Sequence, residues 1–288
     1  MKVNDQSTKK ILDKVKNDKD TTNNSNEIAE YILNHYKKIS YMNLSEIVTD
    51  MAIDEKNIHD FVKKLGYLDY NDFRENLRTA ITGDLKTTDR FKISVEISPK
   101  INNILNRVIE MEKKNIENLS KRYDEKKFMN LVEEVYNAPE IIVVGTRTSS
   151  SLAIYTEYIF NRIGVKARKM ISGCTENFDF LSNTNRNALV LAFGFARYPK
   201  ETIKVLNFFK KRNFNIIGIT DSDLSPLVPL SNQHLIISSE SFSLTDFFAA
   251  PMCLINTLVI SISQLNEEYT LKRLNEFEDV AKDMDFYF

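Results

Sequence analysis

The stretch IIVVGTRTSSS, residues 141–151, decides the fold class of this 288-residue chain. Four β-branched residues in a row predict a strand that is buried on both faces, and a glycine ends it. The small, hydroxyl-bearing residues that follow are typical of a turn leading into a helix. A buried strand that passes through such a turn into a helix is the repeating unit of a parallel sheet covered by helices.

Four more short runs that we expect to be strands follow downstream. Helical stretches such as 150–163 and 200–212 separate several of them. Since short apolar strands that alternate with helices form parallel sheets, we expect a doubly wound, five-stranded parallel sheet. The predicted strands are IIVVG (141–145), VKARKM (165–170), ALVLAFG (188–194), NIIGIT (215–220) and HLIISS (234–239).

Upstream of residue 80 the pattern is that of short helices with tight joints between them. Apolar residues recur at helical spacing, with Asp54 placed to cap one helix and Gly66 placed to end it. Only about three residues, AID, separate the helices at 43–51 and 54–65. This layout is typical of a helix-turn-helix, whose second helix can enter a DNA major groove. The expected helices lie within 1–20 and at 27–36, 43–51, 54–65 and 70–81.

The middle of the chain is expected to connect these two parts. Residues 82–91 are polar without a strong period, which is typical of a linker, and residues 98–137 return to a helical pattern with Pro99 near the start. The apolar run at 247–263 is shorter than a membrane span and favours a buried core helix. The predicted fold is therefore α plus α/β. Its domains are 1–81 (helical), 82–127 (linker and connecting helix), 128–270 (α/β) and 271–288 (C-terminal tail).

Composition limits the possible functions. A hydrophobic content of 42% is enough for a core, and Lys+Arg 39 against Asp+Glu 40 gives no bulk electrostatic case for nucleic acid or membrane binding. The two cysteines, Cys174 and Cys253, form no CxxC and favour reduced core thiols of a cytosolic protein. With three histidines far apart in sequence, a zinc site is not expected. Residues 1–20 hold no apolar segment, so no signal peptide is expected.

Three predicted strand ends carry groups suited to an anion: 145–151, 194–202 and 220–226. Ligands bind outside the carboxyl ends of parallel strands, where helix N-termini offer free N–H groups. Each loop alone could be an ordinary capped turn, but the three converge on one edge. Because no GxGxxG or GxxxxGK[ST] occurs, an anionic or polyhydroxylated small molecule is favoured over a nucleotide, with Arg147 and Arg197 supplying charge. No catalytic arrangement can be assembled, although Glu240 and Asp246 lie near the last strand end.

Nearly the whole chain resembles the RpiR family of bacterial transcriptional regulators. The resemblance rests on residues 28–77, including the KKLGY ending, and on four stretches of the α/β part. These are VVGTRTSSSLA (143–153), FARYPKETIKVL (195–206), GITDSDLSPL (218–227) and FFAAPMCLINTLV (247–259).

The resemblance implies an N-terminal DNA-binding domain and a C-terminal SIS (sugar isomerase) domain. It implies a cytoplasmic homodimer or homotetramer that binds operator DNA and whose SIS domain senses a sugar phosphate or related metabolite. Neither the residues nor the resemblance points to catalysis, a cofactor, a metal or a membrane. Two alternatives remain: a SIS-type sugar-phosphate isomerase, and a metabolite sensor whose helix-turn-helix no longer binds DNA.

Two departures from the family pattern bear on these expectations. Many SIS domains have a loop like SxSGxT, whose hydroxyls hold a phosphate, where this chain has GFARYP at 194–199. Similar proteins usually have Thr and Arg where this chain has Asn57 and Asp60, and Gly where it has Ala52. Residues 1–80 hold 13 Lys and Arg against 14 Asp and Glu, a formal net charge of −1, so the basic surplus usual in DNA binding is absent.

Two sets of candidate residues follow. In the helical domain Lys56, Lys63 and Lys64 can meet phosphates, Asn57 can contact adenine and Asp60 can accept from cytosine. Lys37 and Lys38 offer further phosphate contacts. The candidate DNA-binding residues are Ser45, Lys56, Asn57, His59, Asp60, Lys63 and Lys64. The candidate effector-binding residues are Gly145, Thr146, Arg147, Thr148, Ser149, Ser150, Gly194, Arg197, Tyr198, Asp221, Ser222 and Glu240.

Overall fold

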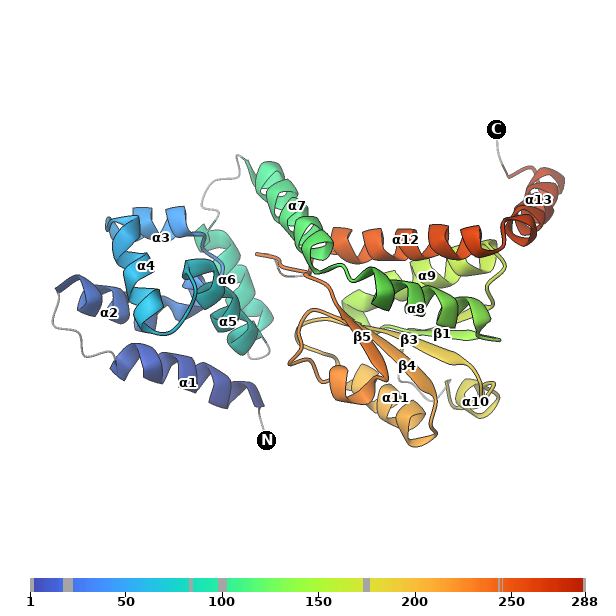
Figure 1. Cartoon of the computed structure of the whole chain (residues 1–288), viewed down its shortest axis with the longest axis horizontal. Helices are drawn as coiled ribbons and strands as arrows, with labels where there is room; N and C mark the ends of the chain where they lie inside the picture. Colours follow the sequence, from blue (N-terminus) through green and yellow to red (C-terminus); the bar gives the residue numbers. More distant parts are fainter. Residues whose placement is uncertain are drawn as a thin grey trace. The chain divides into compact units, whose positions relative to one another are not determined.

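The computed structural model of the chain describes residues 3–17, 23–82, 85–97, 103–172, 177–242, 244 and 246–286. Backbone contacts divide it into two compact units (Figure 1). Unit 1 is Met1–Leu105 with Phe242–Leu244, and unit 2 is Asn106–Ser241 with Thr245–Phe288. Pro99 and Cys174, on which two of the sequence expectations depend, lie outside the described residues.

Unit 1 is a set of short helices around an apolar core. Tyr70, which is fully buried, donates its hydroxyl to the carbonyl of Met42 at 3.1 Å and so ties the joint between two helices to a third. The core also contains Ile58, Phe61 and Phe73, as the helical spacing predicts. The helices are α1 (Val3–Asn17), α2 (Asn23–Ile39), α3 (Leu44–Met51), α4 (Glu55–Lys64), α5 (Tyr70–Thr82) and α6 (Thr87–Ile97).

The turn between α3 and α4 has the expected position and one unexpected cap. A capping box of Asn43 and Glu46 begins α3, and Ala52 ends it in a left-handed conformation, at φ 52°. Asp54 occupies the predicted N-cap of α4, but its side chain makes no capping hydrogen bond, so that part of the prediction is wrong. Gly66 has φ 90°, the left-handed conformation expected after α4.

The predicted linker at 82–91 is helical from Thr87 onward, because α6 buries Arg90, Ile93 and Ile97. Their spacing of three and four residues places them on one helix face. The polar residues around them conceal this stripe from a reading of the sequence. Lys37 of α2 pairs with Asp89 of α6 at 3.5 Å.

Unit 2 is the five-stranded parallel sheet that the sequence predicts, in the order β2-β1-β3-β4-β5. The strands are β1 (Ile141–Val144), β2 (Ala167–Met170), β3 (Leu189–Gly194), β4 (Asn215–Thr220) and β5 (Gln233–Ile236). Figure 1 shows α8, α9 and α12 on one face of this sheet and α10 and α11 on the other. The helices of the unit are α7 (Ile104–Arg122), α8 (Glu125–Asn137), η1 (Arg147–Ser149), α9 (Ser150–Arg162), α10 (Asn177–Ser182), α11 (Lys200–Lys211), η2 (Val228–Leu230), α12 (Ala249–Leu265) and α13 (Glu267–Asp283).

Alternate residues of each strand enter two separate cores, since side chains of a strand point to opposite faces. Ile141 and Val143 pack with α8, α9 and α12, whereas Ile142 and Val144 pack on the side of α11. The apolar run at 247–263 forms α12, whose Leu254, Ile255 and Leu258 are buried, so its prediction as a core helix is confirmed.

The expectation about the cysteines needs correction, and α7 exposes apolar side chains. Cys253 is a free thiol but is only half-buried, so it is not a core residue. In α7 the apolar side chains of Ile104, Leu105, Ile109 and Ile116 are exposed. Within the described residues no single helix is long and apolar enough to cross a membrane.

Candidate functional site

The carboxyl edge of the sheet holds the candidate effector site. Because β1 lies between β2 and β3, the chain leaves β1 toward one side of the sheet and β3 toward the other. The crevice at such a reversal is where open α/β sheets bind ligands. The loops that flank it are 145–150 and 195–199, two of the three that the sequence singles out.

The loop after β1 is held closely by its own backbone and hydroxyls. A Cβ on Gly145 would lie 2.5 Å from the carbonyl oxygen of Ser149, so only glycine fits. The buried Thr146 hydroxyl bonds that of Thr202 in α11 at 2.8 Å. Ser150 donates to the carbonyl of Arg147 at 2.6 Å. The hydroxyls of Thr146 and Ser150 therefore stabilise the conformation of the loop.

The groups that this loop offers to solvent are at its tip. Arg147, at φ 58°, and Thr148 are exposed. The Thr148 hydroxyl lies 3.5 Å from the Asp246 carboxylate, which precedes α12. Ser149 is buried behind them. An exposed guanidinium beside a hydroxyl can hold a phosphate or carboxylate.

The loops after β3 and β4 are joined by Asp221. Its carboxylate accepts from the Tyr198 hydroxyl at 2.8 Å and from the backbone N–H of Ala196 at 3.1 Å. Beneath it, the Thr220 hydroxyl donates to the carbonyl of Gly194 at 2.6 Å. The carboxyl group of Asp221 thus holds the loop after β3, in which the hydroxyls of the SxSGxT pattern are missing.

Asp221 and Tyr198 both have shifted pKa values. Burial raises the pKa of Asp221, and the nearby Asp246 carboxylate raises it further, against the lowering effect of the hydrogen bonds from Tyr198 and Ala196. Burial, followed by the charge of Asp221, raises the pKa of the Tyr198 hydroxyl. The hydroxyl therefore remains a donor throughout the physiological range.

Arg197, Ser222 and Glu240 are the remaining predicted effector residues. Arg197 is exposed, with φ 70°, and the Ser222 hydroxyl accepts from the N–H of Leu224 at 3.1 Å. Glu240 follows the edge strand β5, two strands from the reversal, and pairs with Lys114 of α7 at 3.1 Å.

Sequence reasoning missed the part that α7 plays in this edge. The fully buried Asn115 donates to the carbonyl of Glu240 at 2.9 Å and accepts from its N–H at 3.0 Å. It also accepts from the Ser238 hydroxyl at 2.8 Å. Glu112 accepts from the N–H of Ala249 at 3.2 Å, at the start of α12. An asparagine on an otherwise apolar helix stripe was the only signal available.

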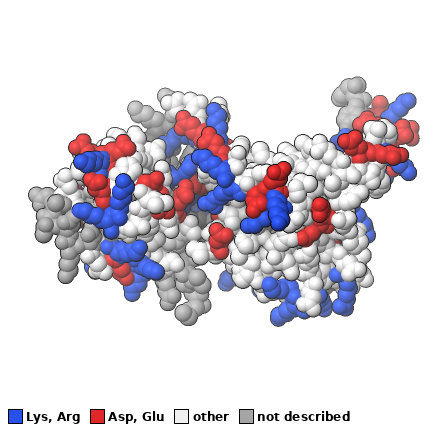
Figure 2. All heavy atoms as spheres, in the orientation of Figure 1, with Lys and Arg blue, Asp and Glu red and all other residues white. Residues whose placement is uncertain are grey.

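The outward face of α4 is the candidate DNA-contacting surface. Lys56, Asp60, Lys63 and Lys64 are exposed, whereas Asn57 is half-buried. Figure 2 shows Lys and Arg atoms over α4 and over α1, with Asp and Glu atoms among them. Six of the seven predicted residues, these five and His59, therefore lie on one helix.

Other predicted DNA contacts are engaged within the domain. His59 lies 3.6 Å from Glu55 one turn earlier, and the exposed Ser45 accepts from the Thr49 hydroxyl through its carbonyl. Lys38 pairs with Asp50 at 2.5 Å, and Lys37 pairs with a carboxylate of α6. These two lysines are therefore weak candidates for phosphate contacts.

Comparison with known proteins identifies both domains. A family described as the helix-turn-helix domain of the rpiR family matches residues 6–83, and the SIS domain matches residues 134–261. A Clostridium perfringens protein described as an uncharacterized HTH-type transcriptional regulator is 26% identical over 230 residues, covering 80% of this chain and 82% of that protein.

Solved structures share the fold. The sugar isomerase domain of an RpiR transcription factor from Sphaerobacter thermophilus is 20% identical, with a TM-score of 0.59, over 62% of this chain and 99% of that one. The Vibrio vulnificus NanR protein, complexed with ManNAc-6P, is also 20% identical, with a TM-score of 0.58, over 95% of this chain and 98% of that one. Similarity at this level of identity shows the fold alone.

Proposed function

Because the chain belongs to the RpiR family of helix-turn-helix and SIS-domain transcriptional regulators, we propose that it binds operator DNA and that a sugar-derived metabolite modulates this binding. The observation that carries the proposal is the pairing, in one chain, of a helix-turn-helix with a polar outward face on α4 and a SIS sheet whose strand order reverses between β1 and β3, where such sheets bind ligands. Regulation is the coupling of these two binding events.

At the DNA, α4 supplies both kinds of contact. Asn57 near its N-terminus can bond adenine with both amide atoms, and Asp60 can accept from cytosine N4. Lys56, Lys63 and Lys64 neutralise phosphates. Ser45 and His59 flank this set on α3 and α4. We expect base contacts from Asn57 and Asp60, and backbone contacts from Lys56 in the first turn and from Lys63 and Lys64 in the last.

At the SIS domain, we propose that a sugar phosphate or related metabolite binds beside the loop after β1. Arg147 and Thr148 are exposed there, whereas the loop after β3 is already bound to Asp221. The phosphate would lie by Arg147, and the sugar hydroxyls would face Arg197 and Asp221. The structural relative NanR was solved with ManNAc-6P, a sugar phosphate, which supports this ligand class.

We also propose that the SIS site binds its ligand without turnover. A sugar isomerase needs a base that is free to take a proton from the substrate. Glu240 is instead paired with Lys114, and Asp221 accepts from the Tyr198 hydroxyl. We therefore favour a non-enzymatic cytoplasmic regulator that acts as a homodimer or homotetramer.

Fluorescence anisotropy tests the proposal. The full-length protein is titrated onto DNA from upstream of its own gene and onto a scrambled duplex, at two salt concentrations, with and without a sugar-phosphate panel. We expect salt-sensitive preference for the upstream DNA, altered by one compound and lost in Asn57→Ala. Equal, weak binding to both duplexes would refute DNA recognition.

One observation favours a second candidate function. Asp60 lies on the exposed face of α4 together with Lys56 and Lys63, which are four and three residues away. Its carboxylate opposes DNA phosphates on the face that would enter the groove. A sensor that no longer binds DNA predicts no binding by the wild type and a gain of binding in Asp60→Arg. A regulator predicts binding by the wild type and an altered base preference in that variant.

A further inference from the structure

The near-neutral charge of unit 1 hides one strongly basic surface. A pocket of about 630 Å³ is lined by Lys9, Lys10, Asp13, Lys14 and Asn17 of α1 with Lys64 and Leu65 at the end of α4. Four lysines stand there against one aspartate, a surplus of three positive charges. Since residues 1–80 carry a net charge of −1, positive charge is concentrated at this surface.

The packing of α1 turns these lysines outward. Val15 is fully buried, and the Thr8 hydroxyl donates to the carbonyl of Ala80 in α5 at 3.1 Å. Lys9 and Lys10 are therefore exposed, and so are Asp13 and Lys14 one turn later. They are absent from the residues that the helix-turn-helix pattern singles out, because that pattern concerns α3 and α4 alone.

Lys14 fixes this surface against the recognition helix. Its ammonium donates to the carbonyl of Leu65 at 3.4 Å and lies 5.2 Å from the centre of the Tyr67 ring. The carbonyls at the end of a helix carry partial negative charge, which a lysine stabilises. The lysines of α1 thus lie beside the C-terminal end of α4.

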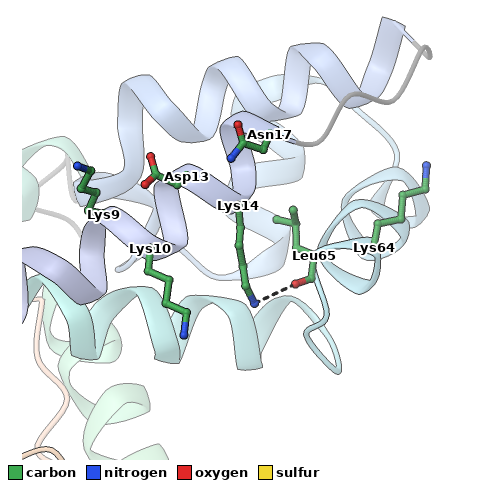
Figure 3. Close-up of a pocket in the computed structure, with 7 residues that line it drawn as sticks. All are labelled: Lys9, Lys10, Asp13, Lys14, Asn17, Lys64 and Leu65. Atoms are coloured by element: carbon green, nitrogen blue, oxygen red, sulfur yellow. Dashed lines mark hydrogen bonds between the residues drawn. The ribbon is translucent and has the colours of Figure 1, made fainter.

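The side chains diverge rather than enclose one point. Figure 3 shows Lys14 reaching toward Leu65, Lys10 pointing to the same side, and Lys9 and Lys64 extending elsewhere. Lysines bind phosphates as separate point charges, without the paired geometry of arginine. A dispersed set of ammonium groups fits a row of phosphates better than one small anion.

We propose that Lys9 and Lys10 of α1, together with Lys14 and Lys64, bind the sugar-phosphate backbone of DNA next to the groove that α4 enters. The inference rests on the proposed DNA binding and extends it to a helix outside the helix-turn-helix pair. The C-terminal end of a recognition helix commonly lies against the DNA backbone, and this surface adjoins that end. Its contacts add affinity for any sequence.

The test is the salt dependence of binding by the full-length protein. Each phosphate contact contributes roughly 0.9 to the slope of log K against log salt concentration, so Lys9→Gln/Lys10→Gln should reduce that slope by roughly 2. The reduction should be the same on upstream and scrambled DNA, which leaves the preference between them unchanged. Lys86→Gln/Lys92→Gln, on exposed positions just before and within α6, makes the same change in net charge and should leave the slope within error.

A second readout locates the contact. Lysine acetylation followed by mass spectrometry should show Lys9 and Lys10 protected by bound duplex and Lys92 equally reactive with and without it. An unchanged slope in Lys9→Gln/Lys10→Gln, or an equal change in the control pair, would overturn the inference while DNA binding that depends on Asn57 stands. Loss of all DNA binding in the wild type would instead remove the proposed function and this inference with it.

Discussion

The single hydroxyl of Tyr198 joins two loops of the effector site. It donates to Asp221 across 23 positions of sequence, and the acceptor is a carboxylate whose pKa burial has already raised. Tyr198→Phe leaves that acceptor short of a donor, so we expect a loss of about 1–2 kcal/mol of unfolding free energy. Urea denaturation measures it. Tyr158→Phe, on an exposed residue of α9, should stay within about 0.5 kcal/mol of wild type.

The carboxyl of Asp221 should also give stability a pH dependence. A group whose pKa is higher in the folded than in the unfolded chain binds protons more tightly when folded. Its contribution is therefore fully present below the ordinary aspartate pKa and declines as pH rises toward the folded-state value. The stability of wild type relative to Asp221→Asn should fall from about pH 4 upward.

Unfolding curves at a series of pH values measure this difference. Asp279→Asn, on the exposed face of α13, provides the control and should show no such trend. A difference between wild type and Asp221→Asn that stays constant with pH would contradict the raised pKa.

Ala52 has a strained backbone conformation in the turn of the helix-turn-helix. Its φ of 52° is left-handed, which costs a residue with a Cβ roughly 1–2 kcal/mol. Ala52→Gly removes that cost but adds unfolded-chain entropy, so a net gain of about 0.5–1 kcal/mol in unfolding free energy is expected. Thermal denaturation checks this. Ala29→Gly, inside α2, should instead lose about 1 kcal/mol, and equal effects would show that the turn is unstrained.

At the scale of elements, α7 supports the sheet edge through one side chain. Asn115 satisfies both backbone groups of Glu240 and the Ser238 hydroxyl from a fully buried position. Asn115→Ala leaves these groups unpaired, and we expect a loss of roughly 2–3 kcal/mol in urea denaturation. Asn106→Ala, exposed on the same helix, should be nearly neutral. A small effect at Asn115 would mean that water replaces the side chain.

Elements with strong local patterns were predictable from the sequence. Strands β1, β3 and β4 are apolar runs that are buried along almost their whole length, and α4 has its buried residues at helical spacing, so the local sequence pattern and the tertiary burial agree. In α6 and α7 they do not. Arg90 is buried in α6, and Ile109 and Ile116 of α7 are exposed while Asn115 is buried. Tertiary contacts decide which face of such a helix is buried, and the hydropathy pattern of the sequence carries no information about those contacts.

The candidate site was predictable only as far as topology fixes it. Parallel strands bring the loops after β1, β3 and β4 to one edge whatever their residues, so the loops themselves were found. The partners within the site were not, because Asp221 meets Tyr198 and Asn115 meets Glu240 across 23 and 125 positions. Pairings at such separations depend on side-chain geometry that no local pattern records.

For the whole molecule, we expect the exposed apolar stripe on α7 to form an oligomer interface. Leu105, Ile109 and Ile116 are 70%, 41% and 37% exposed, and their spacings of four and seven residues place them on one helix face. A contiguous apolar stripe in water favours burial against another surface, and spacing near seven suits a second helix. An operator with two half-sites requires two recognition helices, which a second copy of the chain would supply.

Ile109→Glu/Ile116→Glu tests this interface. Charges on the stripe should convert a dimer or tetramer to a monomer in size-exclusion chromatography with light scattering, while far-ultraviolet circular dichroism stays unchanged because both side chains are exposed. Affinity for a two-half-site operator should fall toward that of a single half-site. Leu68→Glu/Phe91→Glu, which charges two exposed apolar residues of unit 1, is the matched control and should keep the wild-type mass. If the α7 variant also keeps the wild-type mass, the oligomer forms through another face and the stripe has a different partner.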